Sequence, residues 1–104
     1  LGEWVRKRQA MSLEEGVQQL TGEPAAYLGQ KKKGQLAVGM DADFVVFDPE
    51  TIGVQPPEWV NDLPGGKPRL IERSQGVHHT IVGGTVLFAD GIYQGGLPGQ
   101  IMRP

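Results

Sequence analysis

The sequence contains no cysteine and no long apolar run, and only 7 % of its residues are aromatic. Without cysteine the chain has neither a disulfide framework nor a thiolate metal site, which fits a reducing compartment. No stretch is apolar for long enough to span a bilayer, and no charged-then-apolar signal segment opens the chain. We therefore expect a soluble, cytoplasmic protein with no membrane partner.

The chain also has little material for a core. Hydrophobic residues make up 38 % of its 104 residues, while 16 Gly and 8 Pro enrich it in turns. A chain of this length buries only about 60–70 % of the surface of its unfolded form, so its own core should be thin. Because it begins at Leu1 rather than Met, we expect part of a larger protein.

Charge is low and dispersed. The net charge of −2 and the absence of a concentrated basic face argue against a nucleic-acid partner, because phosphate binding needs such a face. The run Lys31, Lys32, Lys33 is the one basic cluster. A solvated turn is its favoured interpretation, and a weak anion contact is the alternative.

The first 29 residues predict helices. Residues 3–8 resemble the last turns of one helix, with cations near its carboxyl end, where the helix dipole favours them. Ser12 and Glu15 form a capping box that starts a second helix, whose apolar positions 13, 17 and 20 share a face. Pro24 suits the first turn of a short third helix that ends at Gly29.

The remainder predicts strands. Residues 43–48 form a short β-branched and aromatic run, which we interpret as a strand buried on both faces. Residues 77–82 and 85–88 flank Gly83-Gly84, a pair suited to a hairpin turn, and a further turn at 90–91 leads to a short return strand. The segment 51–68 holds four prolines and predicts a long loop. Residues from 95 onward predict an irregular tail.

Residues 34–48, GQLAVGMDADFVVFD, resemble the G-x-(L/I)-x-x-G-x-x-A-D signature, followed by a hydrophobic strand and Asp, near the carboxyl end of amidohydrolases. Upstream, SLEEGV and LTGEPA look like the last helices outside the barrel in that superfamily. Downstream, residues 81–91, IVGGTVLFADG, look like its terminal hairpin. The tail 95–104 is similar to the tails of the N-acyl-D-amino-acid deacylases, the D-aminoacylase group.

In physical terms, Gly34 and Gly39 permit turns at the two ends of a short strand, and Ala42 is small enough for close packing. Asp43 can accept amide hydrogens where a turn or strand begins. The signature therefore marks the entry into a small domain and not an active site.

The resemblance implies an α+β fold: N-terminal helices (1–29) followed by a small, mostly antiparallel β domain (30–104), a partial β-sandwich of the amidohydrolase composite domain. It implies that the catalytic TIM barrel and its zinc ligands are absent from this chain. The expected partners are the missing barrel and N-terminal strands of the parent chain. Without them, the uncovered helix faces and strand edges favour self-association.

Candidate chemistry within the chain is sparse. His78 and His79 are adjacent on an expected strand, so their side chains diverge and cannot share one ion without a bulge. Asp41 and Asp43 lie on one side if both are extended, where an acid and base pair is the alternative to turn capping. Ser12 is explained by its capping box, and Ser74 has no histidine at a suggestive spacing.

Neither Gly83-Gly84 nor Gly95-Gly96 leads into a helix, as a phosphate loop would. Trp4 and Trp59 are interpreted as buried anchors, with packing of Trp59 on a neighbouring subunit or barrel as an alternative.

We therefore expect no catalytic, cofactor-binding or metal-binding residue in this chain. It is interpreted as the non-catalytic carboxyl-terminal part of a metal-dependent amidohydrolase that cleaves carbon–nitrogen bonds, with N-acyl-D-amino acids as substrates and zinc in the parent enzyme. Two alternatives remain open: part of a cyclic-amide hydrolase of the hydantoinase or dihydroorotase type, and a stand-alone β interaction module.

Overall fold

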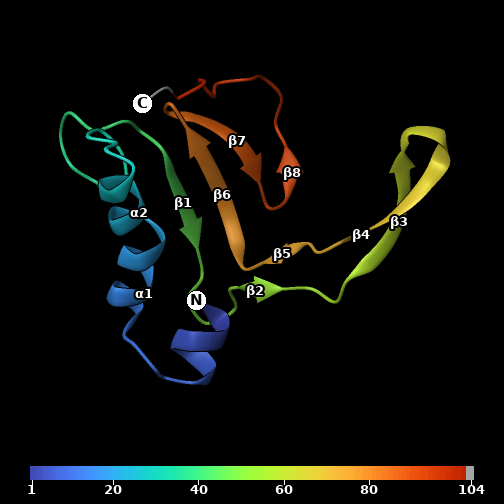
Figure 1. Cartoon of the computed structure of the whole chain (residues 1–104), viewed down its shortest axis with the longest axis horizontal. Helices are drawn as coiled ribbons and strands as arrows, with labels where there is room; N and C mark the ends of the chain where they lie inside the picture. Colours follow the sequence, from blue (N-terminus) through green and yellow to red (C-terminus); the bar gives the residue numbers. More distant parts are fainter. Residues whose placement is uncertain (103–104) are drawn as a thin grey trace.

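The computed structural model describes residues 1–102, with helices at one end and antiparallel strands in the remainder (Figure 1). The fold is α+β and holds no closed barrel within these residues. The helical elements are η1 (Gly2–Lys7), α1 (Leu13–Leu20), α2 (Gly22–Tyr27) and the 3₁₀ turn η2 (Pro64–Gly66). The strands are β1 (Phe44–Phe47), β2 (Gly53–Val54), β3 (Glu58–Leu63), β4 (Lys67–Ile71), β5 (Ser74–Gln75), β6 (Val77–Val82), β7 (Thr85–Ala89) and β8 (Ile92–Tyr93).

The helical prediction for the first 29 residues is confirmed in its main elements. The Ser12 hydroxyl accepts from the Glu15 amide at 3.2 Å, and the Glu15 carboxylate accepts from the Ser12 amide at 2.8 Å, so the capping box starts α1. The first element is a π turn, in which the Arg6 amide reaches the Leu1 carbonyl. It packs on α1 at Gly16, the buried residue of that helix.

The main sheet has four antiparallel strands in the order β1-β6-β7-β8, and its two predicted turns are confirmed. Gly83 and Gly84 have φ of +56° and +76°, which is the geometry of a type I′ hairpin turn. Asp90 and Gly91, with φ of +48° and +79°, repeat it between β7 and β8. Both turns match the twist of the strands they join. Beyond β8 the described tail has no regular structure, and Arg103 and Pro104 lie outside the described residues.

Two expectations near β1 are wrong. Strand β1 is exposed rather than buried on both faces, with Val45 at 50 % and Val46 at 44 % accessibility. It lies at an edge of the main sheet and has β6 as its single strand neighbour among residues 1–102. An apolar run predicts that a strand will be covered, but not that the cover lies in the same 104 residues. Residues 35–38, between Gly34 and Gly39, form no strand in this structure.

The expectation of a long loop at 51–68 is wrong. This segment forms half of a two-stranded arm. Strand β2 pairs with β5 and β3 pairs with β4, and the Gln55 amide bonds to the Arg73 carbonyl at 2.9 Å between the two ladders. The prolines fit because they avoid positions that need an N–H. Pro56 and Pro57 separate β2 from β3, Pro64 starts η2, and Pro68 lies at a register irregularity of a two-stranded ribbon.

These elements bury very little apolar surface. Ile81, at 8 % accessibility, is the single buried hydrophobic side chain of the described residues. The solvent-accessible surface is 8240 Å², whereas a folded monomer of this mass exposes roughly 5,700 Å². The radius of gyration is 15.9 Å, against about 13 Å for a chain of this length. The accessible surface is therefore roughly 2,500 Å² larger than expected for a compact monomer of this mass.

Replacing Gly83 tests the hairpin turn. We expect Gly83→Val to lower the free energy of unfolding by on the order of 2 kcal/mol, because a β-branched residue disfavours positive φ. The matched control is His78→Ala on the same hairpin, which removes an exposed side chain and should have a much smaller effect. Urea midpoints of the two variants decide between them, and equal losses would contradict the assigned turn geometry.

Candidate functional site

A cluster of one lysine and two aspartates lies where the chain enters β1. The Lys33 ammonium is 3.1 Å from the Asp41 carboxylate and is also paired with Asp43. The Asp41 amide donates to the Lys32 carbonyl at 2.8 Å, which folds this segment back on itself and sets Lys33 beside both carboxylates. The expectation of a solvated lysine turn is therefore wrong for Lys33, because its partners lie eight and ten residues further along the chain.

Asp43 connects this cluster to the hairpin. Its carboxylate accepts the Gly83 amide at 2.8 Å, and the Gly84 amide donates to the Ala42 carbonyl at 2.9 Å. The hydrogen bond from Lys33, followed by that from the Gly83 amide, holds the pKa of Asp43 below its ordinary value. Asp43 and Asp41 in turn raise the pKa of Lys33. Asp43 does accept a backbone amide, as expected, but the amide is that of Gly83, 40 residues away, and not one at its own turn or strand start. Such a carboxylate is a poor proton acceptor near neutral pH.

The two histidines occupy neighbouring positions of β6. His78 Nδ1 is 3.3 Å from the Asp90 carboxylate, whereas His79 lies opposite Val46 and Ala89 in the sheet register. Successive strand residues project to opposite faces. Within residues 1–102, no three His, Asp or Glu side chains come together closely enough to hold a metal ion. The prediction that the chain carries no metal ligand remains a prediction.

The other candidates have local structural roles. Ser12 belongs to the capping box, and Ser74 lies in β5 opposite Val54. Trp4 was expected to be a buried anchor, and this expectation is wrong. Its ring is half exposed, with the Arg8 guanidinium stacked 4.8 Å above it. Trp59 is also exposed, in β3.

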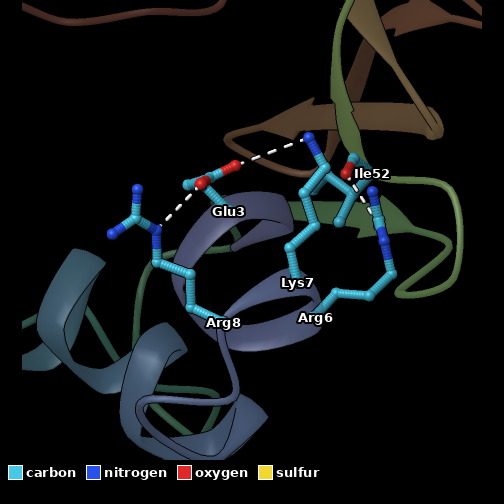
Figure 2. A network of polar contacts seen from close by, with 5 residues as sticks. All are labelled: Glu3, Arg6, Lys7, Arg8 and Ile52. Carbon is cyan, nitrogen blue, oxygen red and sulfur yellow. Dashed lines mark hydrogen bonds and ion pairs between the residues drawn. The ribbon is translucent and has the colours of Figure 1, made fainter.

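A second polar connection, at Arg6, had no sequence signal. Its guanidinium donates to the carbonyl of Ile52 at 2.9 Å (Figure 2). It also donates to the carbonyl of Pro49 at 3.0 Å, and so fastens η1 to the turn after β1. A Cβ on Gly2 would lie 2.6 Å from the Ile52 oxygen, so the close approach requires glycine there. Sequence reasoning assigned this cation to the helix dipole, because a guanidinium that binds distant backbone carbonyls leaves no local pattern.

An open apolar cleft lies between α1, α2 and the strands β1 and β6. It has a volume of about 750 Å³, and its apolar lining includes Val17, Leu28, Phe44, Val45 and Ile81. Lys33 and Asp43 stand at its border. The cleft can accept apolar side chains, and the charged Lys33 and Asp43 at its border are paired with each other.

The fold and these contacts define an α+β domain with a mostly antiparallel sheet. Residues 1–88 match the family described as the amidohydrolase family. The chain belongs to the amidohydrolase family, as the signature at 34–48 predicted.

Three relatives, all from Alcaligenes xylosoxydans xylosoxydans, carry the comparison further. The chain is 35 % identical to an N-acyl-D-glutamate deacylase over 103 residues, which are 99 % of this chain and 19 % of the relative. It is 34 % identical to an N-acyl-D-aspartate deacylase over 96 % of the chain and 18 % of the relative. It is 31 % identical to a D-aminoacylase over 98 % of the chain and 19 % of the relative.

The predicted likeness to the D-aminoacylase group is thus confirmed. The chain spans about a fifth of the length of these curated relatives. No solved structure matches it significantly.

The lowered pKa of Asp43 predicts a measurable titration. We expect its carboxyl resonance to titrate below 3.8, and the Gly83 amide resonance to shift with the same midpoint. Lys33→Gln should move that midpoint back toward 3.8, because it removes the larger cause. Since the folded pKa is depressed, the carboxylate stabilises the fold above about pH 4 and loses this effect as pH falls through the folded pKa. A midpoint unaffected by Lys33→Gln would contradict the pairing.

Proposed function

We propose that this chain is a supporting, non-catalytic part of a larger amidohydrolase that removes the acyl group from N-acyl-D-amino acids. The observation that carries the proposal is the alignment of nearly the whole chain with about a fifth of three deacylases. The near absence of a core supports it, because a domain with one buried hydrophobic side chain needs other protein to cover its apolar surface.

The family relationship also motivates a metal proposal for the parent enzyme. Zinc in such enzymes takes three or four His, Cys, Asp or Glu ligands. Residues 1–102 do not fit this requirement, because the paired His78 and Asp90 have no third donor beside them and the chain has no cysteine. We propose that the parent depends on zinc and that its ligands come from protein outside this chain.

The partners that we propose are the barrel and the N-terminal strands of the same parent protein. The apolar cleft beside α1 and α2 and the unpaired edge of β1 are the surfaces suited to them. A strand edge presents free N–H and C=O groups, and pairing satisfies these groups. The expected cytoplasmic location stays a proposal. Within the described residues, no helix combines the length and apolarity needed to cross a membrane.

Substrate hydrolysis by the protein as its gene encodes it tests the proposed activity. We expect release of free amino acid from N-acetyl-D-glutamate, N-acetyl-D-aspartate or a neutral N-acetyl-D-amino acid, with little from the L-enantiomers. Hydantoin and dihydroorotate are the control substrates for the cyclic-amide alternative. Metal chelation should abolish hydrolysis and zinc should restore it. Turnover of the cyclic amides alone would overturn the deacylase proposal.

The chain of 104 residues by itself tests the supporting role. We expect no hydrolysis of N-acetyl-D-amino acids and no stoichiometric zinc after dialysis, because the two histidines project to opposite faces of β6. Elemental analysis measures the zinc. One tightly held zinc per chain, lost in His78→Ala, would show that the chain contributes a metal ligand and would contradict the proposal.

A further inference from the structure

The sequence contains one Asp-Gly pair, Asp90-Gly91, and no Asn-Gly pair. An Asp-Gly pair is open to a spontaneous reaction, in which the main-chain nitrogen of the glycine attacks the aspartate side chain and closes a succinimide ring. Glycine favours the attack, because it has no Cβ to shield its nitrogen. The surroundings of the pair in the fold determine how readily the reaction proceeds.

The pair lies in the hairpin turn between β7 and β8, where it is open to solvent. The Asp90 side chain is 74 % accessible. Within residues 1–102, no atom beyond its chain neighbours lies within 4 Å of the position that a Cβ on Gly91 would take. The Gly91 amide donates no backbone hydrogen bond among these residues, so no such bond has to break before its nitrogen attacks.

In the closed hairpin, His78 engages Asp90. The His78 Nδ1 lies 3.3 Å from the Asp90 carboxylate, and the Asp90 amide donates to the His78 carbonyl at 2.7 Å. These contacts hold Asp90 against β6. A protonated imidazole also favours the charged carboxylate, whereas the reaction needs a neutral carboxyl that can lose its hydroxyl as water. His78 therefore protects the pair while the hairpin is closed.

Strand β8 closes the hairpin only weakly. It has two residues, and its pairs with β7 are Ala89 with Ile92 and Phe88 with Tyr93. Ile92 is 67 % and Tyr93 is 50 % accessible, and the described chain beyond β8 has no regular structure. Elements with few buried contacts open locally at a small cost in free energy. Opening of β8 frees the turn to rotate into the geometry of attack.

We propose that Asp90 is a site of spontaneous isoaspartate formation, restrained by His78 and by the closure of β8. The Gly91 nitrogen bonds to Cγ of Asp90, and the carboxyl hydroxyl leaves with the amide hydrogen as water. Water then opens the ring. Attack at the Asp90 main-chain carbonyl breaks its bond to nitrogen and leaves the chain running through Cβ and Cγ, which is isoaspartate, whereas attack at Cγ restores aspartate. No reactant other than water is needed.

Isoaspartate adds one carbon atom to the main chain of the turn. A hairpin turn fixes the register of the strands that it joins, so the longer turn cannot keep Ala89 opposite Ile92. We expect β8 to separate from β7 and the contact between the Phe88 and Tyr93 rings, with centroids 5.6 Å apart, to be lost. This inference goes beyond the proposed deacylase function and does not depend on it.

The test measures isoaspartate at Asp90 during incubation of the protein as its gene encodes it, by peptide mapping with electron-transfer fragmentation. A synthetic peptide of residues 85–95 is the unfolded reference, and we expect the protein to convert more slowly than this peptide. His78→Ala should raise the rate about two- to fivefold, the factor that one exposed ion pair supplies. The matched control is His79→Ala, which should leave the rate unchanged because its side chain projects to the opposite face of β6.

Amide exchange supplies a second measurement that does not rely on the variants. Residues 86–94 should lose protection in the converted fraction, whereas β1 should keep its protection. The proposal is overturned by an absence of isoaspartate at Asp90 while the peptide converts fully, by a rate equal to that of the peptide, or by a rate that His78→Ala does not raise. Unchanged protection of residues 86–94 in the converted fraction would overturn the structural consequence. Deacylase activity is assayed separately, so a failure of one proposal leaves the other testable.

Discussion

Ile81 is the one large apolar side chain that the described residues bury, and much of the structure follows from this shortage of core. Folding must offset the conformational entropy of every residue that it orders, and apolar burial is the principal favourable term. Here the apolar residues of α1, β1, β3 and β7 lie largely at the surface. With so little apolar surface buried, the accessible surface of the described residues exceeds that of an ordinary monomer of this mass.

Hydrogen bonds between distant parts of the chain hold the elements in place where a core does not. The Asp43 carboxylate joins the start of β1 to the hairpin turn at Gly83, and the Arg6 guanidinium joins η1 to the carbonyls after β1. A side chain bonded to backbone fixes the position of the backbone more directly than a contact between two flexible side chains does. These connections restrain the cleft between the helices and the sheet without filling it.

The amidohydrolase signature has a physical explanation in these contacts. Gly34 has φ of +82° and approaches the Thr21 carbonyl so closely that a Cβ would lie 2.7 Å from its oxygen. Asp43 is the residue that accepts both the lysine and the hairpin amide. The signature thus encodes how the chain passes from the helices into the sheet. This segment lies within residues 1–88, which match the amidohydrolase family.

The sequence by itself determined the elements whose causes are local. A capping box at Ser12 and Glu15 and glycines that take positive φ at 83 and 84 act over a few residues or through backbone geometry, so their outcomes were predictable. Tertiary structure alone decided the rest. Whether β1 is covered, whether the proline-rich segment pairs as an arm, and where Asp43 and Arg6 find their partners all depend on residues brought together from separate parts of the chain. An apolar run indicates that a strand will be covered, and a proline shows that its position has no N–H to donate. Neither feature identifies the partner.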